Sequence, residues 1–264
     1  NRQIENAIML SKNKIKLLHS LEMKKNRDAQ QSFVAEGPKI VHDILSRHKD
    51  QLSVIAATEE WFAQEHELMA GLQCERIVVS ADELTKVSFL CHPQQVFAVF
   101  RKFAEITPDE LPSLADKLTL VLDGVQDPGN LGTIIRIADW FGIEDIICSK
   151  DTVDVYNPKV VQATMGSIAR VRVSYMDLKP LFEVLPPTLP IYGTLLEENN
   201  MYSEQLSHNG IIIMGNEGKG ISPQIRQFIT KGLRIPNYPE GRDTADSLNV
   251  AVATAIICAE FRRR

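Results

Sequence analysis

Two stretches near the C-terminal end of the sequence decide the fold: IIIMGNEGKGIS at residues 211–222 and SLNVAVATAIICAEF at residues 247–261. The three isoleucines at 211–213 predict a buried β-strand. The strand leads into a loop whose glycines permit positive φ and let a ligand approach the backbone. Ser222 and Pro223 then predict a helix, as an N-cap followed by proline at the first helical position.

A second strand-loop-helix unit follows the first. Leu233–Pro236 predicts a strand, and a polar loop leads from it to Asp246–Ser247 at the start of an apolar helix. A third glycine-bearing turn lies upstream, at DPGNLG, residues 127–132. Because ligands of open α/β sheets bind at the carboxyl ends of the strands, these turns predict a ligand site.

The loop 215–222 matches neither common phosphate-binding pattern. A P-loop has lysine after its second glycine, where this chain has Ile221. The dinucleotide pattern G-x-G-x-x-G is absent, because the glycines run G-x-x-G-x-G. An ATPase or an NAD-dependent enzyme is therefore not indicated. For any single glycine-rich loop, the alternative to a ligand site is that the glycines serve only tight turns. The presence of three such turns in this chain favours a ligand site.

The composition is that of a globular protein of one large or two ordinary domains: 264 residues, 44% apolar, 24% charged, with a net charge of −5. Residues 1–27 hold seven basic and two acidic side chains, a local charge of +5 that suits a phosphate backbone. The four cysteines are scattered without a C-x-x-C pair, so we expect no metal, no disulfides and a cytoplasmic protein. We expect no membrane contact, because no apolar stretch is long enough to span a bilayer.

Alternating short strands and helices predict an α/β fold in two domains. Residues 1–103 form the first, with a basic amphipathic helix at Ile4–Leu21. Its four strands are expected at Ser32–Ala35, Leu52–Ala57, Ile77–Val79 and Val96–Phe100. The acidic segment 104–116, with two prolines, is the expected linker. Residues 117–264 form the second domain, with a mostly parallel sheet covered on both faces.

The second domain repeats the alternation. Its further strands are expected at Leu118–Leu122, Asp145–Cys148, Ala169–Ser174 and Ile191–Leu195, and its helices at Asn130–Phe141, Asn157–Met165 and Leu178–Leu185. Asn130 and Ser247 each stand where an N-cap would accept an amide hydrogen bond.

Three segments together, DPGNLGTIIRIADWFG (127–142), IIIMGNEGKGIS (211–222) and SLNVAVATAI (247–256), resemble the signature motifs of the SpoU (TrmH-type) branch of the SPOUT RNA methyltransferases. The resemblance implies a deep trefoil knot, S-adenosylmethionine as methyl donor, a homodimer with composite sites, and methylation of an RNA ribose 2′-hydroxyl. The first half resembles an RNA-binding domain similar to small ribosomal proteins, and this favours ribosomal RNA.

Two alternatives stay open beside that reading. One is a tRNA 2′-O-methyltransferase, and the other is a non-catalytic RNA-binding or ribosome-assembly factor on the same fold. The joint presence of the polar motif residues speaks against a non-catalytic protein. Two departures from the family pattern are the long loop Asn237–Asp246, which puts the closure of the donor pocket in doubt, and Gln162, where many relatives have a basic residue.

The resemblance also implies the site residues. The expected catalytic residues are Arg136, Asn130, Glu217, Ser247 and Asn249. The expected donor-binding residues are Thr194, Leu195, Met214, Gly215, Gly218, Ile235, Pro236 and Leu248. The expected RNA-binding residues of the first domain are Lys12, Lys14, Lys16, Lys24 and Arg27. The family treats the arginine as catalytic, sometimes as a base; a guanidinium with a pKa above about 12 is better suited to hold a phosphate or polarise the hydroxyl.

Overall fold

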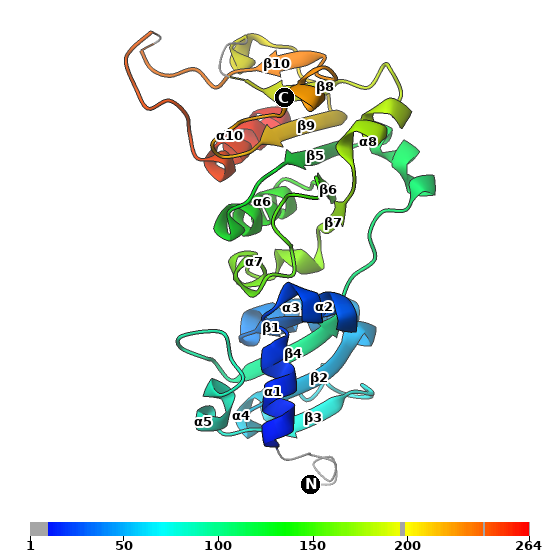
Figure 1. Ribbon diagram of the computed structural model, residues 1–264, viewed down its shortest axis with the longest axis vertical. Coiled ribbons are helices and arrows are strands. Elements are labelled where there is room, and N and C mark those ends of the chain that lie inside the picture. Colours follow the sequence, from blue (N-terminus) through cyan, green and yellow to red (C-terminus); the bar gives the residue numbers. More distant parts are fainter. Residues whose placement is uncertain (1–9, 196–198, 240, 264) are drawn as a thin grey trace. The chain divides into compact units, whose positions relative to one another are not determined.

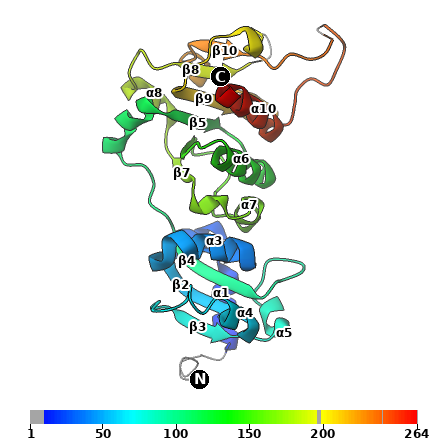
Figure 2. The same ribbon diagram turned by 180° about the vertical axis from the view of Figure 1, so that it is seen from behind.

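The computed structural model describes residues 10–195, 199–239 and 241–263. The chain forms two compact units (Figures 1 and 2). Unit 1 takes residues up to 103 together with 154–169, and unit 2 takes 104–153 and the chain from 170 onward. The assignment of 154–169 to unit 1 was not expected from the sequence, which places these residues among the elements of the second domain.

Unit 1 is built on a mixed sheet of four strands, in the order β1-β4-β2-β3. Their bounds are β1 (Ser32–Glu36), β2 (Leu52–Ala57), β3 (Glu75–Val78) and β4 (Val96–Arg101). β4 runs antiparallel to both of its neighbours, whereas β2 and β3 are parallel. The four strands lie where the sequence predicts them.

Helices cover both faces of this sheet. They are α1 (Lys12–Ser20), α2 (Lys24–Gln30), α3 (Pro38–His48), α4 (Glu59–Gln64), α5 (Ala81–Thr85) and α7 (Pro158–Ala163), with 3₁₀ turns η1 (Lys49–Gln51) and η3 (Ser167–Ala169). α1 lies across one face and α3 across the other (Figures 1 and 2). Leu18 of α1 packs with Ile77 and Phe97. Of the predicted helix Ile4–Leu21, residues 4–9 lie outside the described residues.

Residues 154–169 complete unit 1 although they stand between two strands of the other sheet. The Tyr156 ring lies 4.7 Å from that of Phe33, centroid to centroid. The His48 Nε2 is 2.9 Å from the carbonyl oxygen of Ala169. Gly166 leaves no room for a side chain, because a Cβ there would lie 2.3 Å from the Asp43 carboxylate. Ring contacts, a hydrogen bond and close packing thus fix this segment within unit 1.

Unit 2 contains a sheet of six strands in the order β10-β8-β9-β5-β6-β7, and all neighbours are parallel. Their bounds are β5 (Leu118–Asp123), β6 (Asp145–Cys148), β7 (Arg172–Tyr175), β8 (Ile191–Thr194), β9 (Gly210–Gly215) and β10 (Lys231–Leu233). The three isoleucines of β9 are fully buried. The parallel α/β sheet predicted from the sequence is confirmed, and the trefoil knot stays a prediction.

The helices of unit 2 are α6 (Pro128–Trp140), α8 (Leu178–Val184), α9 (Pro223–Arg226) and α10 (Val250–Arg263), with 3₁₀ turns η2 (Pro108–Asp116) and η4 (Met201–Ser203). α8 and α9 pack on one face of the sheet, and α6 and α10 lie side by side on the other (Figure 1). Arg262 near the end of α10 donates to the carbonyl oxygen of Phe141, 2.7 Å away, just beyond the end of α6. The first turns of the two helices also meet, so the helices run in the same direction.

Several boundaries differ from the sequence-based expectation. The stretch expected as a linker, 104–116, contains η2 and packs into unit 2, where Leu114 and Ile106 join the core. The strand expected at Ala169–Ser174 begins only at Arg172, because Ala169 belongs to η3. The strand expected at Leu233–Pro236 ends at Leu233, whose partner Thr194 is the last residue of β8.

Candidate functional site

The carboxyl ends of four strands meet at one edge of the unit 2 sheet, because all six strands are parallel. β5 ends at Asp123 opposite Gly215, the last residue of β9. β8 ends at Thr194 opposite Leu233 of β10. The loops that follow these strands carry the motif residues, so the expected ligand site lies at this edge.

The glycine-rich loop after β9 closes on itself. The backbone amide of Asn216 donates to the Gly220 carbonyl at 3.0 Å, and the Gly220 amide donates back at 2.9 Å. Gly215 accepts no side chain, since a Cβ would lie 2.3 Å from Gly220 C and Ile221 N. Gly220 has a φ of +67°, a conformation that glycine adopts without strain. These glycines give the loop its tight, defined shape.

The Glu217 carboxylate reaches from this loop to the start of α6. It accepts hydrogen bonds from the backbone amides of Gln126 at 3.2 Å and Asp127 at 3.0 Å, and from Asn130 Nδ2 at 3.2 Å. Partial burial raises the pKa of Glu217, but the hydrogen bonds outweigh it, chiefly that from the Asp127 amide, and hold the pKa below its ordinary value. Glu217 is therefore an anion placed at the positive end of a helix.

Asn130 joins Glu217 to the third motif. Its Nδ2 donates to Glu217, and its Oδ1 accepts a hydrogen bond of 2.9 Å from Asn249 Nδ2. The three side chains come from three segments that lie far apart in the sequence, and the structure brings them into one hydrogen-bonded chain. We call the chain of Glu217, Asn130 and Asn249 the motif network.

The two expected N-caps are wrong. Asp127, and not Asn130, caps α6: its Oδ1 accepts from the Asn130 amide at 2.8 Å. Asn249, and not Ser247, caps α10: its Oδ1 accepts from the amides of Ala251 at 2.9 Å and Val252 at 3.2 Å. Asn130 is not used as a cap, and Asn249 caps with its Oδ1 alone, so the Asn249 Nδ2 can donate to the Asn130 Oδ1. Ser247 lies exposed before the helix.

Arg136 lies on the exposed side of α6, six residues after Asn130. It has no hydrogen bond or ion pair with any residue that the structure describes. Trp140, one turn further along the same side, is 85% exposed. The structure therefore connects Glu217, Asn130 and Asn249 but leaves Arg136, six residues further along α6, without a partner among the described residues.

The expected donor-binding residues follow the strand ends. Thr194 closes β8, and its Oγ1 donates to the Ile213 carbonyl at 3.3 Å. Met214 and Gly215 are buried at the end of β9, whereas Gly218 is exposed in the loop. The remaining residues are apolar and half-buried, Leu195, Ile235 and Pro236, or exposed, as is Leu248 at 51%.

The long loop between β10 and α10 is held by local contacts. Asn237 Nδ2 donates to the Arg242 carbonyl at 2.8 Å, and the Arg242 amide donates to the Pro239 carbonyl at 3.1 Å. Residues 241–249 are exposed. In Figure 1 the chain between β10 and α10 extends away from the sheet before it returns to the start of α10.

The expected RNA-binding residues of unit 1 fall into three groups. Lys12 and Lys16 are exposed on α1. Lys14 and Lys24 pair with carboxylates, Glu75 and Asp28 respectively. Arg27 is 2% exposed, which corrects the expectation that it belongs to an RNA-binding surface.

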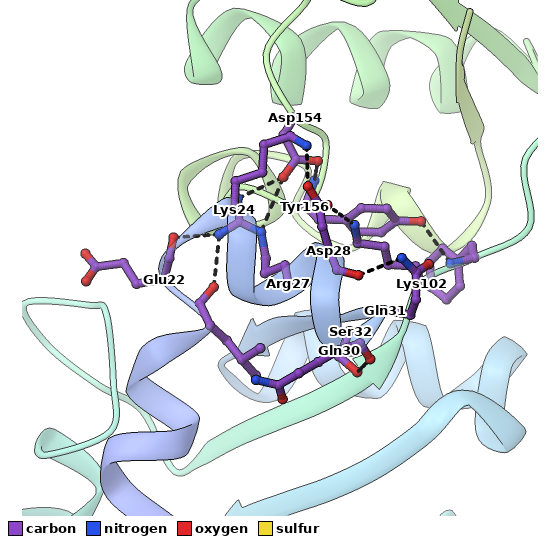
Figure 3. A network of polar contacts seen from close by, with 12 residues as sticks. Glu22, Lys24, Arg27, Asp28, Gln30, Gln31, Ser32, Lys102, Asp154 and Tyr156 are labelled. Atoms are coloured by element: carbon purple, nitrogen blue, oxygen red, sulfur yellow. Dashed lines mark hydrogen bonds and ion pairs between the residues drawn. The ribbon is translucent and has the colours of Figure 1, made fainter.

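The guanidinium of Arg27 is held inside unit 1. It donates to the carbonyl oxygens of Leu21 at 2.9 Å and Glu22 at 2.6 Å, and to Asp154 Oδ2 at 2.8 Å (Figure 3). The basic cluster in the sequence could not reveal this burial, because Asp154 stands 127 residues away.

Sequence analysis missed two residues that shape the site. Asn216 bonds within the glycine loop, and Asp123 Oδ2 accepts from the Ser222 amide at 2.7 Å, at the end of the same loop. The Asp-Pro pair at 127–128 did carry a readable signal, since a cap followed by proline at the first helical position is a common helix start.

Within the described residues, no cluster of His, Cys, Asp or Glu is arranged to hold a metal ion, and no helix is long and apolar enough to cross a membrane.

Comparison with known proteins gives two family matches. The model of the SpoU rRNA Methylase family matches residues 117–259, more than half of the chain. The model of the MRM3-like substrate binding domain matches residues 12–98.

Relatives resemble the chain over almost its whole length. The 23S rRNA (guanosine(2553)-2′-O)-methyltransferase RlmP of Bacillus subtilis (strain 168) is 32% identical over 263 residues, 99% of each protein. A Porphyromonas gingivalis structure, described as an RNA methyltransferase of the TrmH family, has a TM-score of 0.85 at 37% identity, covering 97% of this chain and 100% of that one. The AdoMet-bound rRNA methyltransferase from Sinorhizobium meliloti has a TM-score of 0.83 at 27% identity, covering 98% of both chains. The chain belongs to the SpoU rRNA methylase family.

Proposed function

We propose that this protein is an S-adenosylmethionine-dependent methyltransferase that modifies a ribose 2′-hydroxyl of ribosomal RNA. The observation that carries the proposal is the motif network, in which one hydrogen-bonded chain joins the loop after β9, the start of α6 and the start of α10. Family membership and the printed activity of the Bacillus subtilis relative support the reaction type and the rRNA substrate.

The catalytic assignment is Arg136, Asn130, Glu217, Ser247 and Asn249. Arg136 keeps its charge at neutral pH, so it serves the reaction as a cation that binds the phosphate beside the target ribose or polarises the hydroxyl. Its exposure and its lack of a partner among the described residues suit this role. Glu217 and Asn249 hold Asn130 between them, and Ser247 adds an exposed hydroxyl at the entrance to α10.

The donor assignment is Thr194, Leu195, Met214, Gly215, Gly218, Ile235, Pro236 and Leu248. S-adenosylmethionine held there would supply an electrophilic methyl group to the ribose oxygen and would leave as S-adenosylhomocysteine, with the hydroxyl proton released to solvent. The residues fit such a molecule: strand ends offer backbone groups for the adenine edge, and half-buried apolar side chains at 195, 235 and 236 offer faces for the ring. Positioning of the two reactants accounts for much of the expected rate.

We propose a homodimer formed through α6 and α10. Trp140 on α6 and Val252 on α10 are 85% and 50% exposed, on two helices that lie side by side. Large exposed apolar side chains of this kind are typical of interfaces. Arg136 lies one turn from Trp140, so the interface would bring it beside a second subunit.

The four free thiols support a cytoplasmic location.

Calorimetric titration with S-adenosylmethionine tests the proposal against its main rival, a non-catalytic RNA-binding factor. An enzyme of this class binds the donor at micromolar concentration, whereas a pure binding module shows no heat of binding. A Gly218→Trp variant, which fills the exposed end of the loop with a bulky ring, serves as the binding-site control and is expected to weaken the titration. Absence of donor binding by the intact, folded chain would contradict the proposal.

A further inference from the structure

Asn216, the first residue of the glycine loop, uses its carboxamide in two directions. Its Nδ2 donates to the carbonyl oxygen of Gly124 at 2.7 Å, outside the loop. Its Oδ1 accepts from the backbone amides of Gly218 at 3.0 Å and Lys219 at 2.9 Å, inside the loop. The side chain therefore ties the loop to the end of β5 and at the same time fixes the turn around Glu217.

The acceptor of this hydrogen bond is itself held firmly. Gly124 has a φ of +78°, and its amide donates to Ser149 Oγ at 2.8 Å. Ser149 Oγ in turn donates to Asp151 Oδ1 at 2.5 Å. A Cβ at Gly124 would lie 3.2 Å from Asp151 Oδ2 and 3.7 Å from Asn216 Cβ, so the space there is filled. The carbonyl of Gly124 is thus a fixed point at the ends of β5 and β6.

The far end of the loop is anchored to the same strand. Asp123, buried at the end of β5, accepts from the Ser222 amide at 2.7 Å. Between these two anchors, the Glu217 carboxylate accepts from the amides of Gln126 and Asp127 at the start of α6. The position of Glu217, and through it that of Asn130 and Asn249, depends on the anchors.

We propose that Asn216 is a positioning residue for methyl transfer, which holds the loop against Gly124 so that Glu217 can order Asn130 and Asn249. This inference rests on the proposed function. Asn216 itself is assigned no contact with donor or RNA. Its effect on the reaction passes through Glu217, the next residue in the chain.

Asparagine is the side chain that this arrangement requires, because one end must donate and the other must accept. An ionised aspartate keeps the acceptor for Gly218 and Lys219 but has no hydrogen for Gly124. It would also place a second carboxylate beside Glu217, whose Oε2 lies 3.5 Å from Asn216 Nδ2. Alanine loses both interactions. The two substitutions therefore remove different parts of the anchor.

Protonation separates the two variants further. A protonated aspartate at 216 regains an O–H that can donate to Gly124, so lowering the pH restores the anchor in Asn216→Asp but not in Asn216→Ala. The ionisable groups on the segments that meet there are Glu217 and Lys219 of the loop, Asp123 at the end of β5, Asp151 after β6, Asp127 before α6, and Arg226 of α9, which donates to the Ile221 carbonyl. Four of these six are acidic, and like charges favour protonation of an added carboxyl group.

The chain offers a matched control in Asn209, which precedes β9 as Asn216 follows it. Asn209 Nδ2 donates to the Ala115 carbonyl at 2.7 Å, and its Oδ1 accepts from Ser207 Oγ at 2.5 Å. Asn209→Asp makes the same chemical change in the same kind of hydrogen bond, but at the amino end of β9, away from the expected site.

The experiment measures kcat for methyl transfer to a 23S rRNA transcript at saturating S-adenosylmethionine, at pH 8 and pH 6, with donor affinity by titration. For Asn216→Asp we expect kcat at pH 8 to fall about ten- to a hundredfold, the loss that a small misplacement of reacting groups produces. Relative to the wild type, this loss should be smaller at pH 6 than at pH 8, because the neighbouring carboxylates favour protonation of the new carboxyl group. Asn216→Ala should lose as much at both pH values, and Asn209→Asp should stay within about twofold of the wild type.

Two results would overturn the inference: a wild-type kcat in Asn216→Asp, or an equal loss in Asn209→Asp. Hydrogen exchange of the Gln126 and Asp127 amides measures how well Glu217 holds them, and it does not depend on methyl transfer. We expect their protection to fall in Asn216→Asp and Asn216→Ala and to persist in Asn209→Asp. If the wild type transfers no methyl group, the proposed function fails, and unchanged protection in the Asn216 variants would still refute the positioning role.

Discussion

Arg27 and Glu217 each tie together segments that are distant in the sequence, but they do so in opposite surroundings. Arg27 is buried in unit 1, where two carbonyl oxygens and the Asp154 carboxylate take up its guanidinium (Figure 3). Glu217 lies in an exposed loop of unit 2, where two backbone amides and Asn130 donate to it.

The two networks differ in whether all of their polar groups are paired within the protein. A buried charge must have its partners within the protein, because the cost of leaving it unpaired is large, and the Arg27 network is closed in this way. The motif network ends at exposed side chains, and Arg136, further along α6, has no partner among the described residues. Polar groups that remain open to solvent at the carboxyl ends of parallel strands are available to a ligand.

The largest effect on activity is expected for Arg136→Ala. If Arg136 binds phosphate or polarises the hydroxyl, kcat should fall by about a thousandfold or more, as for loss of a charged group that acts in the transition state. Donor affinity should stay within about twofold, because Arg136 is assigned to the RNA side of the site. Arg47→Ala, at another exposed helix position, is the control for kcat. A loss of donor binding in Arg136→Ala would show that its role is misassigned.

The closed network is expected to matter for stability. Arg27→Met leaves the Asp154 carboxylate, whose side chain is 11% exposed, and two carbonyl oxygens without the guanidinium, and this should destabilise unit 1 by about 3 kcal/mol. Lys24→Met removes the exposed Lys24–Asp28 pair and should cost only about 0–0.5 kcal/mol. Urea unfolding measures both. A cost below about 1 kcal/mol for Arg27→Met would mean that the buried pair is not important for folding.

Glu217→Gln changes the motif network with little change of shape. The NH₂ group of the Gln side chain cannot accept the hydrogen bonds that the Glu217 carboxylate accepts from N–H donors. We therefore expect kcat to fall about tenfold or more. Glu83→Gln is the control, since Glu83 also accepts an amide hydrogen bond at a helix start, from Ser80 at 2.9 Å, but in unit 1. Equal kcat losses in the two variants would remove Glu217 from the site.

Acid unfolding checks the charge of Glu217. Hydrogen bonds keep its pKa in the folded protein below the ordinary value of 4.5, so ionised Glu217 stabilises the fold above that pH, and the stabilisation is lost as the pH falls through the lowered pKa. The difference in melting temperature between the wild type and Glu217→Gln should therefore be full at pH 7 and shrink below about pH 4.5. A difference that grows on acidification would contradict the lowered pKa.

The smallest effect is expected on the surface of unit 1. Reversing the charges of Lys12 and Lys16 should weaken binding to the 23S rRNA transcript several-fold and reduce the slope of log K against log salt by about 0.7–0.9 per lost phosphate contact. Lys24→Glu is the control, since Lys24 pairs with Asp28. An unchanged salt slope would show that the outer side of α1 is solvated and does not contact RNA.

The sequence predicted the elements whose signals are local. The isoleucine run of β9, the helix start at Ser222–Pro223 and the glycine turns all depend on neighbouring residues, and these elements lie where expected. The proximity of Asn130 and Asn249 was only partly predicted: the family motifs implied that both belong to one site, whereas their mutual hydrogen bond depends on the packing of α6 beside α10. Burial of Arg27 and the docking of residues 154–169 in unit 1 could not be predicted, because both depend on contacts between residues more than a hundred positions apart.

The central claim is that the motif network and Arg136 serve one reaction, methylation of a ribose in ribosomal RNA. The most direct test incubates the purified chain with 23S rRNA and S-adenosylmethionine carrying a labelled methyl group, and then locates the label by its protection of one phosphodiester bond from alkaline hydrolysis. We predict one protected ribose with the wild type and none with Arg136→Ala or Glu217→Gln at equal donor occupancy. Label on a base, or a protected ribose at the wild-type level in both variants, would contradict the account.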